Sequence, residues 1–365
     1  MPVVRGVKSP VERFAGAAET FTIEGMMQNG WALQCGTSHF LGQNFGRAFD
    51  VDYQTDKKGT LDGTSSNGAG KDREIVWGAS FGVSTRLIGA MIMTHSDDNG
   101  LVVPPYLAPI QYILIPLYSK KAKDSDMNEK IASVVTSLSK NMKRNSISFK
   151  VDDSDRRPGA KYYHWERRGV PVRISIGGRE ASSGKLEGSI RHNSEKITIS
   201  MDELDDSTFP NILRNINHEM YNTAVTRLSH RSEYITSYEE LKRTMSGSLE
   251  TGIDIENDIE NGVDVTQSPA FFLAPWACNS DNEAAIKAEL KLTIRCYPLC
   301  YNPSVLTEYN IANRDNSNFI DSTAEVIDMT PLLDSFLDIP ALDESTKCFY
   351  SGNPATHIAL FARAY

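Results

Sequence analysis

The sequence REIVWGASFGVSTRLIGAMIMTH, residues 73–95, joins a strand-like segment to an apolar run with helical character. We predict a strand that enters a helix, with LIGAMIM buried. Arg86 stands directly before the apolar run. A guanidinium there can grip phosphate oxygens bidentately, and the helix start adds positive potential. The alternative is that Arg86 pairs with a carboxylate for structural reasons only.

A second group of polar residues precedes this stretch, in Gln34-Cys35-Gly36-Thr37-Ser38-His39. Small residues allow close approach of a ligand to the backbone, while the amide, hydroxyl and imidazole groups offer hydrogen bonds. We predict a ligand-binding ledge at Gln34, Thr37 and His39. A glycine turn with a hydrogen-bonded histidine explains the same letters without any ligand.

Composition limits the class of protein. The 365 residues predict two or three domains, and 40% hydrophobic with 23% charged residues is typical of a soluble globular chain. No apolar run is long enough to span a membrane, and the first residues lack the apolar core of a secretory signal. The net charge of −9 excludes a uniformly basic nucleic-acid binder. We expect a cytoplasmic protein without a membrane partner.

Strands and helices alternate from Ile110 to about residue 204. Strands are predicted at 110–117, 146–151 and 171–177, a helix from a capping box of Asp126 and Glu129, a helix at 157–169, and a closing hairpin at 184–201. This order predicts a small α/β domain with a mixed sheet. A helix follows from Ser207 to about Arg231.

The part from Arg156 to Arg191 is locally basic, with nine Lys or Arg against three Glu. Its arginines alternate with Tyr162, Tyr163 and Trp165. Aromatic rings stack on unpaired RNA bases and arginines contact their edges or phosphates. The alternative is a solvated helix face with one tryptophan in the core.

Four of the five cysteines lie in the last hundred residues: Cys278, Cys296, Cys300 and Cys348. Cys296 and Cys300 have a spacing that zinc sites tolerate, but no paired knuckle appears at both ends. We therefore favour free buried thiols.

Two further segments lack periodicity. Thr55–Lys71 predicts a mobile surface loop, and the acidic Ile253–Asp264 predicts a linker or exposed hairpin.

The order of these signals is more specific than any one of them. FAGAAETFTIEGMMQNGWALQCGTSHFLGQNFGRAFDV, the GVSTRLIG motif, KYYHWERRGVPVRISIGGRE and the final LFARAY together resemble prolyl-tRNA synthetases of the eukaryote-like type. GVSTRLIG resembles motif 3 of class II synthetases. The resemblance implies an α+β class II catalytic core (a partial antiparallel sheet) at 1–106, an α/β anticodon-binding domain with a mixed sheet at 107–204, a helical and acidic connector at 205–265, and a small α+β C-terminal domain at 266–365.

The resemblance also implies roles for individual residues. Gln34, Thr37, Ser84 and Arg86 would bind ATP, with Arg86 as the catalytic group; His39 would line the proline pocket; and Glu166, Arg173 and Arg179 would read the anticodon guanines. The implied function is ATP-dependent activation of proline and its transfer to tRNA(Pro), with Mg²⁺ accompanying ATP.

The resemblance begins after the place where the family carries motifs 1 and 2. Motif 2 holds the α-phosphate and motif 1 forms the homodimer interface, so we expect no proline activation by this chain alone. We also expect exposed strand edges and apolar faces.

Two further departures bear on the sites. Of the family's four zinc cysteines only Cys278 and Cys348 match, with Glu283 and Tyr350 at the other positions, so we expect no zinc. Phe81 replaces a tryptophan, which should loosen the wall of the nucleotide pocket. Two other functions stay open: a non-catalytic tRNA-binding paralogue that retains the anticodon domain, and another class II synthetase such as the threonyl or histidyl enzyme.

Overall fold

The computed structural model describes residues 1–55, 73–119, 124–250, 269–302 and 336–365. The predicted loop at 55–71, apart from Thr55, and the predicted linker at 253–264 lie outside these ranges. The chain divides into two compact units: residues 88–226 with Met1, and residues 2–87 with 227–365. Among the described residues, no helix combines the length and apolar character needed to cross a lipid bilayer.

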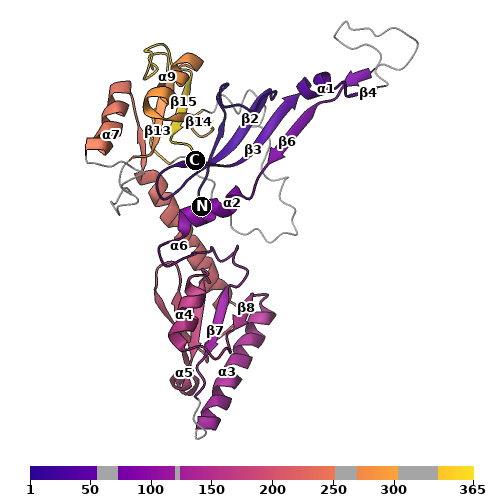
Figure 1. The fold of residues 1–365 in the computed structure, drawn as a ribbon, viewed down its shortest axis with the longest axis vertical. Helices are drawn as coiled ribbons and strands as arrows, with labels where there is room; N and C mark the ends of the chain where they lie inside the picture. Colours follow the sequence, from indigo (N-terminus) through magenta and orange to yellow (C-terminus); the bar gives the residue numbers. More distant parts are fainter. Residues whose placement is uncertain (56–72, 120–123, 251–268, 303–335) are drawn as a thin grey trace. The chain divides into compact units, whose positions relative to one another are not determined.

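The unit of residues 88–226 contains a five-stranded mixed sheet in the order β11-β10-β9-β7-β8. β7 (Tyr112–Pro116) runs parallel to β8 (Phe149–Val151) and β9 (Val172–Ile176), whereas β10 (Lys185–Ile190) is antiparallel to β9 and to β11 (Lys196–Ser200). The predicted mixed sheet and closing hairpin are confirmed. α3 (Ser125–Arg144), α4 (Pro158–Glu166) and α5 (Gly178–Ser183) accompany it, and α6 (Thr208–His230) follows (Figure 1).

Apolar periodicity accounts for the core of this unit. All five residues of β7 are buried, and α3 buries Ile131, Val135, Leu138 and Met142, which recur at helical spacing. The predicted capping box of Asp126 and Glu129 is wrong, because the residue before the helix is Asp124 and Asp126 lies in the first turn. Asp124 instead accepts a hydrogen bond from Ser119.

The other unit contains an eight-stranded sheet in the order β12-β13-β15-β14-β1-β2-β3-β6. β1 (Val4–Val7), β2 (Glu19–Met26), β3 (Ala32–Gly42) and β6 (Gly78–Gly82) come from the start of the chain. β12 (Ser232–Tyr234), β13 (Phe271–Trp276), β14 (Thr293–Pro298) and β15 (His357–Ala362) come from its end. Every neighbouring pair is antiparallel except β12 with β13.

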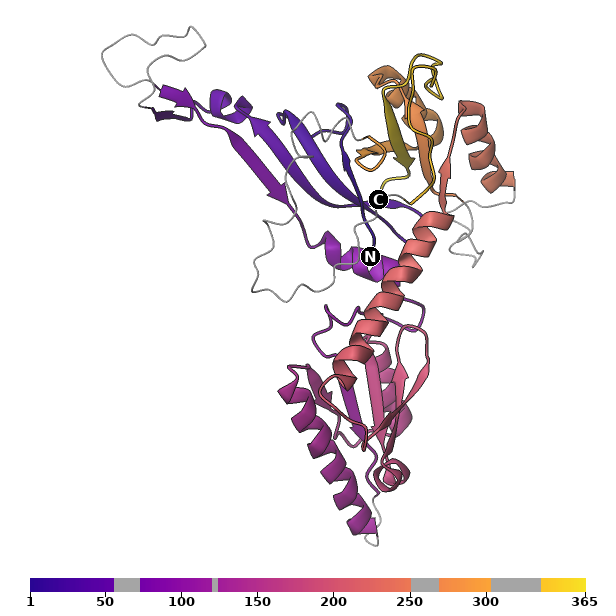
Figure 2. The ribbon, with the colours of Figure 1, turned by 180° about the vertical axis from the view of Figure 1, so that it is seen from behind.

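The two groups of strands meet where β1 pairs with β14. Figure 2 shows the long β2, β3 and β6 side by side. The remaining described elements of the unit are α1 (Asn44–Ala48), α7 (Tyr238–Glu250), α9 (Ser280–Leu290) and the two-stranded ribbon of β4 (Asp52–Gln54) with β5 (Arg73–Ile75). The sequence suggested separate catalytic and C-terminal domains, but their strands share one sheet. The four predicted domain limits stay predictions.

The predicted exposure of strand edges and apolar side chains agrees with β6, which ends the sheet. Phe81 is 81% exposed and Val83 75%. α2 (Arg86–His95) follows β6, as predicted, but the expected burial of LIGAMIM is wrong. Ala90 is buried, whereas Leu87 and Ile88 are exposed because no described side chain covers them.

Candidate functional site

β3 and β6 bring together two polar motifs that are more than forty residues apart in the chain. Thr37 of β3 lies opposite Gly82 of β6, and His39 lies opposite Ser80. A Cβ atom on Gly82 would approach the Thr37 hydroxyl to 3.2 Å, so glycine allows this close contact. The strand pairing therefore joins the predicted ledge to the segment that leads into Arg86.

Arg86 is the first residue of α2, and its backbone N–H donates to Ser84 Oγ at 3.3 Å. Its side chain is exposed and has no ion-pair or hydrogen-bond partner among the described residues. Burial, followed by the charge of Glu24, raises the pKa of the Cys35 thiol to about 11, while the charge of Arg86 acts in the opposite direction. Arg86 follows Gly82 by four residues, and Gly82 lies opposite Thr37, so the start of α2 is close along the chain to the strand that pairs with the ledge.

His39 is held in one orientation. Its Nδ1 lies 3.0 Å from the Thr20 hydroxyl on β2, and the Phe14 ring packs against it with centroids 4.7 Å apart. Gln34, Thr37 and His39 are all half-buried. Half-buried polar groups on one rigid strand are suited to orienting a small ligand, because little side-chain freedom is left to lose.

An apolar hollow of about 410 Å³ lies on the other face of this sheet. Phe21, Ser38 and Phe81 stand opposite one another on β2, β3 and β6 and line the hollow, so their side chains share a face. The side chains of Thr37 and His39 alternate to the opposite face, but Thr37 also lines the hollow beside Phe81. The expectation that Phe81 forms a wall beside the ledge therefore stays a prediction.

In the other unit, α4 and β9 bring Glu166 and Arg173 to one pocket, which Tyr162, Trp165 and Arg191 also line. The Arg173 guanidinium lies 3.9 Å from the centre of the Tyr162 ring, and burial lowers the pKa of Arg173. Arg191 makes a two-point contact with Asp97 at 2.8 and 2.6 Å. The cavity is small, about 40 Å³, so the flat ring, carboxylate and guanidinium can contact the edge of an unpaired base but do not enclose one.

Arg179 does not line that pocket. It lies on α5, exposed, and pairs with Glu180 at 2.9 Å and Glu187 at 2.8 Å. The sequence analysis named Tyr162 among the aromatic residues that could stack on RNA bases but gave it no individual role, although its distance of four residues from Glu166 puts both on one face of a helix. That spacing was the signal that could have found it.

α4 is anchored by the buried Asp152. The Trp165 Nε1 donates to Asp152 Oδ2 at 2.7 Å, and Lys161 Nζ donates to the Asp152 backbone oxygen at 2.8 Å. Burial opposes ionisation of Asp152, but hydrogen bonds from Ser154 and Trp165 hold its pKa below the usual value. These contacts fix the helix that carries Tyr162 and Glu166.

The positions compared with zinc ligands do not converge. Cys278 Sγ lies 3.1 Å from His357 Nδ1, Cys348 is buried in the core, and Glu283 accepts from Ser9 at 2.9 Å. No group of three or more His, Cys, Asp or Glu among the described residues could hold a metal ion. The five cysteines form no disulfide with one another, but Cys278 and Cys300 are exposed rather than buried.

Two comparisons show which known proteins this chain is similar to. Residues 111–207 match the family model described as an anticodon binding domain. The whole chain is 39% identical over 366 residues to a proline–tRNA ligase of Parabacteroides distasonis, and covers 58% of that relative. Similar proline–tRNA ligases occur in Azobacteroides pseudotrichonymphae, at 41% identity over 82% of this chain and 53% of the relative, and in Flavobacterium johnsoniae, at 35% over the whole chain and 58% of the relative.

The chain thus spans little more than half the length of the curated relatives that it matches. The similarity extends over the full chain at 35 to 39% identity, so it includes the ledge and the pocket at Glu166 and Arg173. Over its whole length the chain is thus similar to curated proline–tRNA ligases.

Proposed function

We propose that this chain supplies the nucleotide ledge and the anticodon-reading domain of a proline–tRNA ligase. The reaction has two steps. The proline carboxylate attacks the α-phosphorus of ATP, which forms prolyl-adenylate and releases pyrophosphate. The terminal ribose hydroxyl of tRNA(Pro) then attacks the prolyl carbonyl and AMP leaves.

In this proposal Gln34, Thr37 and Ser84 bind ATP by hydrogen bonds, and Arg86 neutralises its phosphate charge. His39 shapes the pocket for the pyrrolidine ring. Phosphorus displacement needs mainly positioning and charge neutralisation, which fixed strands and a guanidinium can provide. Mg²⁺ would supply further neutralisation as a partner of the nucleotide. The described residues offer no cluster of ligands for it, so we assign no step to the metal.

One observation carries the ATP role. The pairing of Thr37 with Gly82 joins the two motifs, and Arg86 begins α2 only four residues after Gly82. No described carboxylate neutralises Arg86, which argues against a purely structural ion pair. A non-catalytic tRNA binder has no use for an unpaired arginine beside this ledge, so that alternative is less well supported.

For the anticodon, we propose that Arg173 donates to the acceptors of guanine and that Glu166 accepts from its ring N–H and amino group. Tyr162 would stack on a base or hold Arg173 in place. The proposed role of Arg179 requires release from Glu180 and Glu187, so we expect a smaller contribution from it. For the whole protein, a homodimer and a cytoplasmic location also stay proposals.

Proline-dependent ATP–pyrophosphate exchange tests the catalytic part. We would measure it in this chain and in the chain completed with the part of the Parabacteroides distasonis relative that it does not span. Exchange should appear in the completed protein, and Arg86→Ala should lower it at least about a hundredfold, the usual cost of losing one charge-stabilising group. Arg47→Ala is the matched control, since Arg47 is an exposed arginine of the same unit whose side chain hydrogen-bonds to Gln43 alone among the residues that the structure describes. Near-normal exchange in Arg86→Ala would refute the role.

A further inference from the structure

A second cleft, of about 580 Å³, lies on another side of α4. It is separate from the pocket that contains Glu166 and Arg173. Its lining contains three guanidinium groups, one imidazole, one phenol ring and no carboxylate: Arg156, Ala160, Tyr163, His164, Arg167 and Arg168. A cleft lined by one sign of charge concentrates counter-charged ligands.

Its arginines differ from three other arginines of the same unit. Arg144, Arg179 and Arg191 each pair with a carboxylate. Arg156, Arg167 and Arg168 have no carboxylate partner among the described residues of the chain. Cations that converge without an anion repel one another, and a bound anion would remove that repulsion.

His164 contacts one of these arginines but does not neutralise its charge. Arg168 Nη1 contacts its Nε2, and burial, together with the charges of Arg168 and Arg156, lowers the pKa of His164. The imidazole is therefore neutral near pH 7 and accepts a hydrogen bond from Arg168. This contact orients the guanidinium without neutralising it.

Aromatic rings hold the arginines in place. The guanidinium of Arg167 lies 5.5 Å from the centre of the Tyr163 ring, and that of Arg168 lies 5.6 Å from the centre of the Trp165 ring. Trp165 is itself fixed by its hydrogen bond to Asp152. A guanidinium stacked on a ring loses less freedom when it binds a phosphate, and its planar fork matches phosphate oxygens.

We propose that this cleft binds the phosphodiester backbone of the RNA whose bases enter the pocket at Glu166 and Arg173. The proposal rests on the proposed tRNA binding. Glu166 and Arg167 are consecutive residues that line different cavities, so one RNA loop can reach both. α4 is only about 14 Å long at 1.5 Å per residue. This continuity favours RNA over an acidic protein segment.

The two cavities are lined by different chemical groups, so we expect them to contact different parts of the RNA. A pocket with both a carboxylate and a guanidinium can discriminate base edges. A cleft that contains donors only cannot, and phosphate contacts contribute affinity and register but no sequence information. The arginines of the cleft therefore increase affinity for any anticodon to the same extent.

The test uses the full chain and the double variant Arg156→Gln, Arg168→Gln. Binding of tRNA(Pro) is measured by fluorescence anisotropy between about 50 and 200 mM salt. We expect affinity at low salt to fall at least about tenfold, and the slope of log affinity against log salt to fall by about two, one for each lost phosphate contact. The loss should be equal for tRNA(Pro) and for a transcript with its anticodon guanines changed.

Arg144→Gln is the matched control. Arg144 is an exposed arginine of the same unit that already pairs with Asp206, so its loss should leave the salt slope unchanged. Circular dichroism of each variant checks folding. An unchanged slope in a folded double variant overturns the cleft proposal, and so does a loss confined to the unchanged anticodon.

The proposed base readout fails in a different way. If the unaltered chain binds both transcripts equally while the double variant still lowers the salt slope, Glu166 and Arg173 do not read bases but the cleft binds backbone. If an acidic peptide displaces the RNA from the unaltered chain and not from the double variant, the cleft belongs to a protein partner and the RNA proposal is overturned.

Discussion

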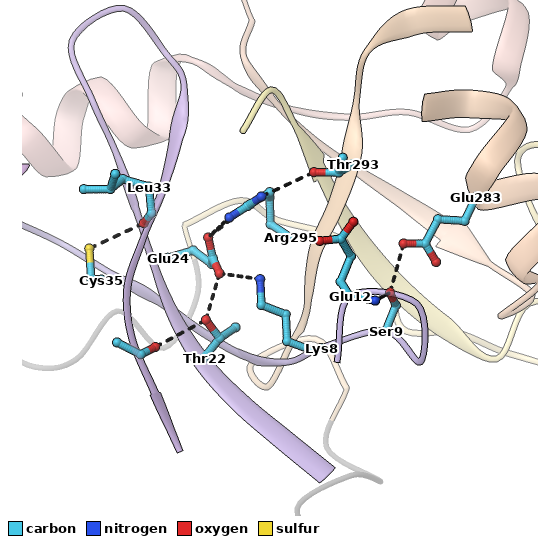
Figure 3. A network of polar contacts seen from close by, with 11 residues as sticks. Lys8, Ser9, Glu12, Thr22, Glu24, Leu33, Cys35, Glu283, Thr293 and Arg295 are labelled. Atoms are coloured by element: carbon cyan, nitrogen blue, oxygen red, sulfur yellow. Dashed lines mark hydrogen bonds and ion pairs between the residues drawn. The ribbon is translucent and has the colours of Figure 1, made fainter. Parts of the chain in front are cut away.

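Replacing Arg295 by methionine should strongly destabilise the unit that contains the eight-stranded sheet. Arg295 lies on β14 and donates to the Glu24 carboxylate of β2 from Nε at 3.1 Å and from Nη2 at 2.9 Å. Lys8 and Thr22 complete the shell of Glu24, each at 2.8 Å (Figure 3). Glu24 is fully buried, and Arg295 is only 6% exposed.

The magnitude follows from this burial. Arg295→Met removes two charge-assisted hydrogen bonds and leaves a buried carboxylate with one cation instead of two. Removing one partner of a buried ion pair usually costs about 3–5 kcal/mol, and we expect about 3 kcal/mol because Lys8 remains. A domain is stable by only about 5–15 kcal/mol, so the change is large.

Urea unfolding followed by tryptophan fluorescence and near-ultraviolet circular dichroism measures this cost. Lys287→Met is the matched control, because it removes a cation whose pair with Glu12, at 3.3 Å, has a largely exposed lysine. Such pairs contribute at most about 1 kcal/mol. Arg295→Lys, which keeps the charge but not the fork, should fall between the two. A loss in Arg295→Met no larger than in the control would refute the reasoning.

Three further predictions concern other parts of the chain. Burial raises the pKa of Glu283 to about 7, so its stabilising contribution is present below about pH 4.5 and is lost as the pH rises through 7. Glu283→Gln should remove up to about 3 kcal/mol of this pH dependence of the unfolding free energy, measured by urea titration at several pH values. An unaltered dependence on pH would contradict this prediction. Gly169→Ala should cost more than about 1 kcal/mol in thermal unfolding, because φ is +69° and a Cβ would lie 2.6 Å from the Leu101 oxygen, whereas the control Gly159→Ala meets nothing and should be nearly neutral. Elemental analysis of the purified protein should find well under one zinc per chain, since the described residues bring no three suitable ligands together, and a stoichiometric value would show a site that we have missed.

Local sequence patterns were sufficient for most of the unit of residues 88–226. β7 is an unbroken apolar run, α3 repeats apolar residues at helical spacing, and α4 has Pro158 at its start, with Gly169 three residues beyond its last residue. Each signal depends on neighbours within a few residues. The same local argument could not show that Arg179 pairs with Glu187, eight residues away, instead of joining Arg173.

Long-range pairing was beyond such reasoning. β1 and β14 are separated by more than 280 residues, and nothing in either sequence specifies the other as its partner. The predicted burial of LIGAMIM in α2 was wrong for a related reason. An apolar run indicates that a helix has an apolar face, but it does not show that other described residues cover that face. Burial is a property of the assembled structure, whereas periodicity belongs to the segment.

The buried network explains why the ledge depends on the end of the chain. Glu24 lies opposite Gln34 in the pairing of β2 with β3, so the carboxylate that Arg295 holds is directly beside the ledge. From the other side, Ala32, two residues before Gln34, donates to the Arg363 oxygen at 2.8 Å and accepts from the Tyr365 N–H at 3.1 Å. Residues beyond 290 therefore hold both the start of β3 at Ala32 and the carboxylate that lies beside Gln34. A nucleotide site that must keep its donors within a fraction of an ångström gains rigidity from such support, and the sheet that joins the two ends of the sequence provides it.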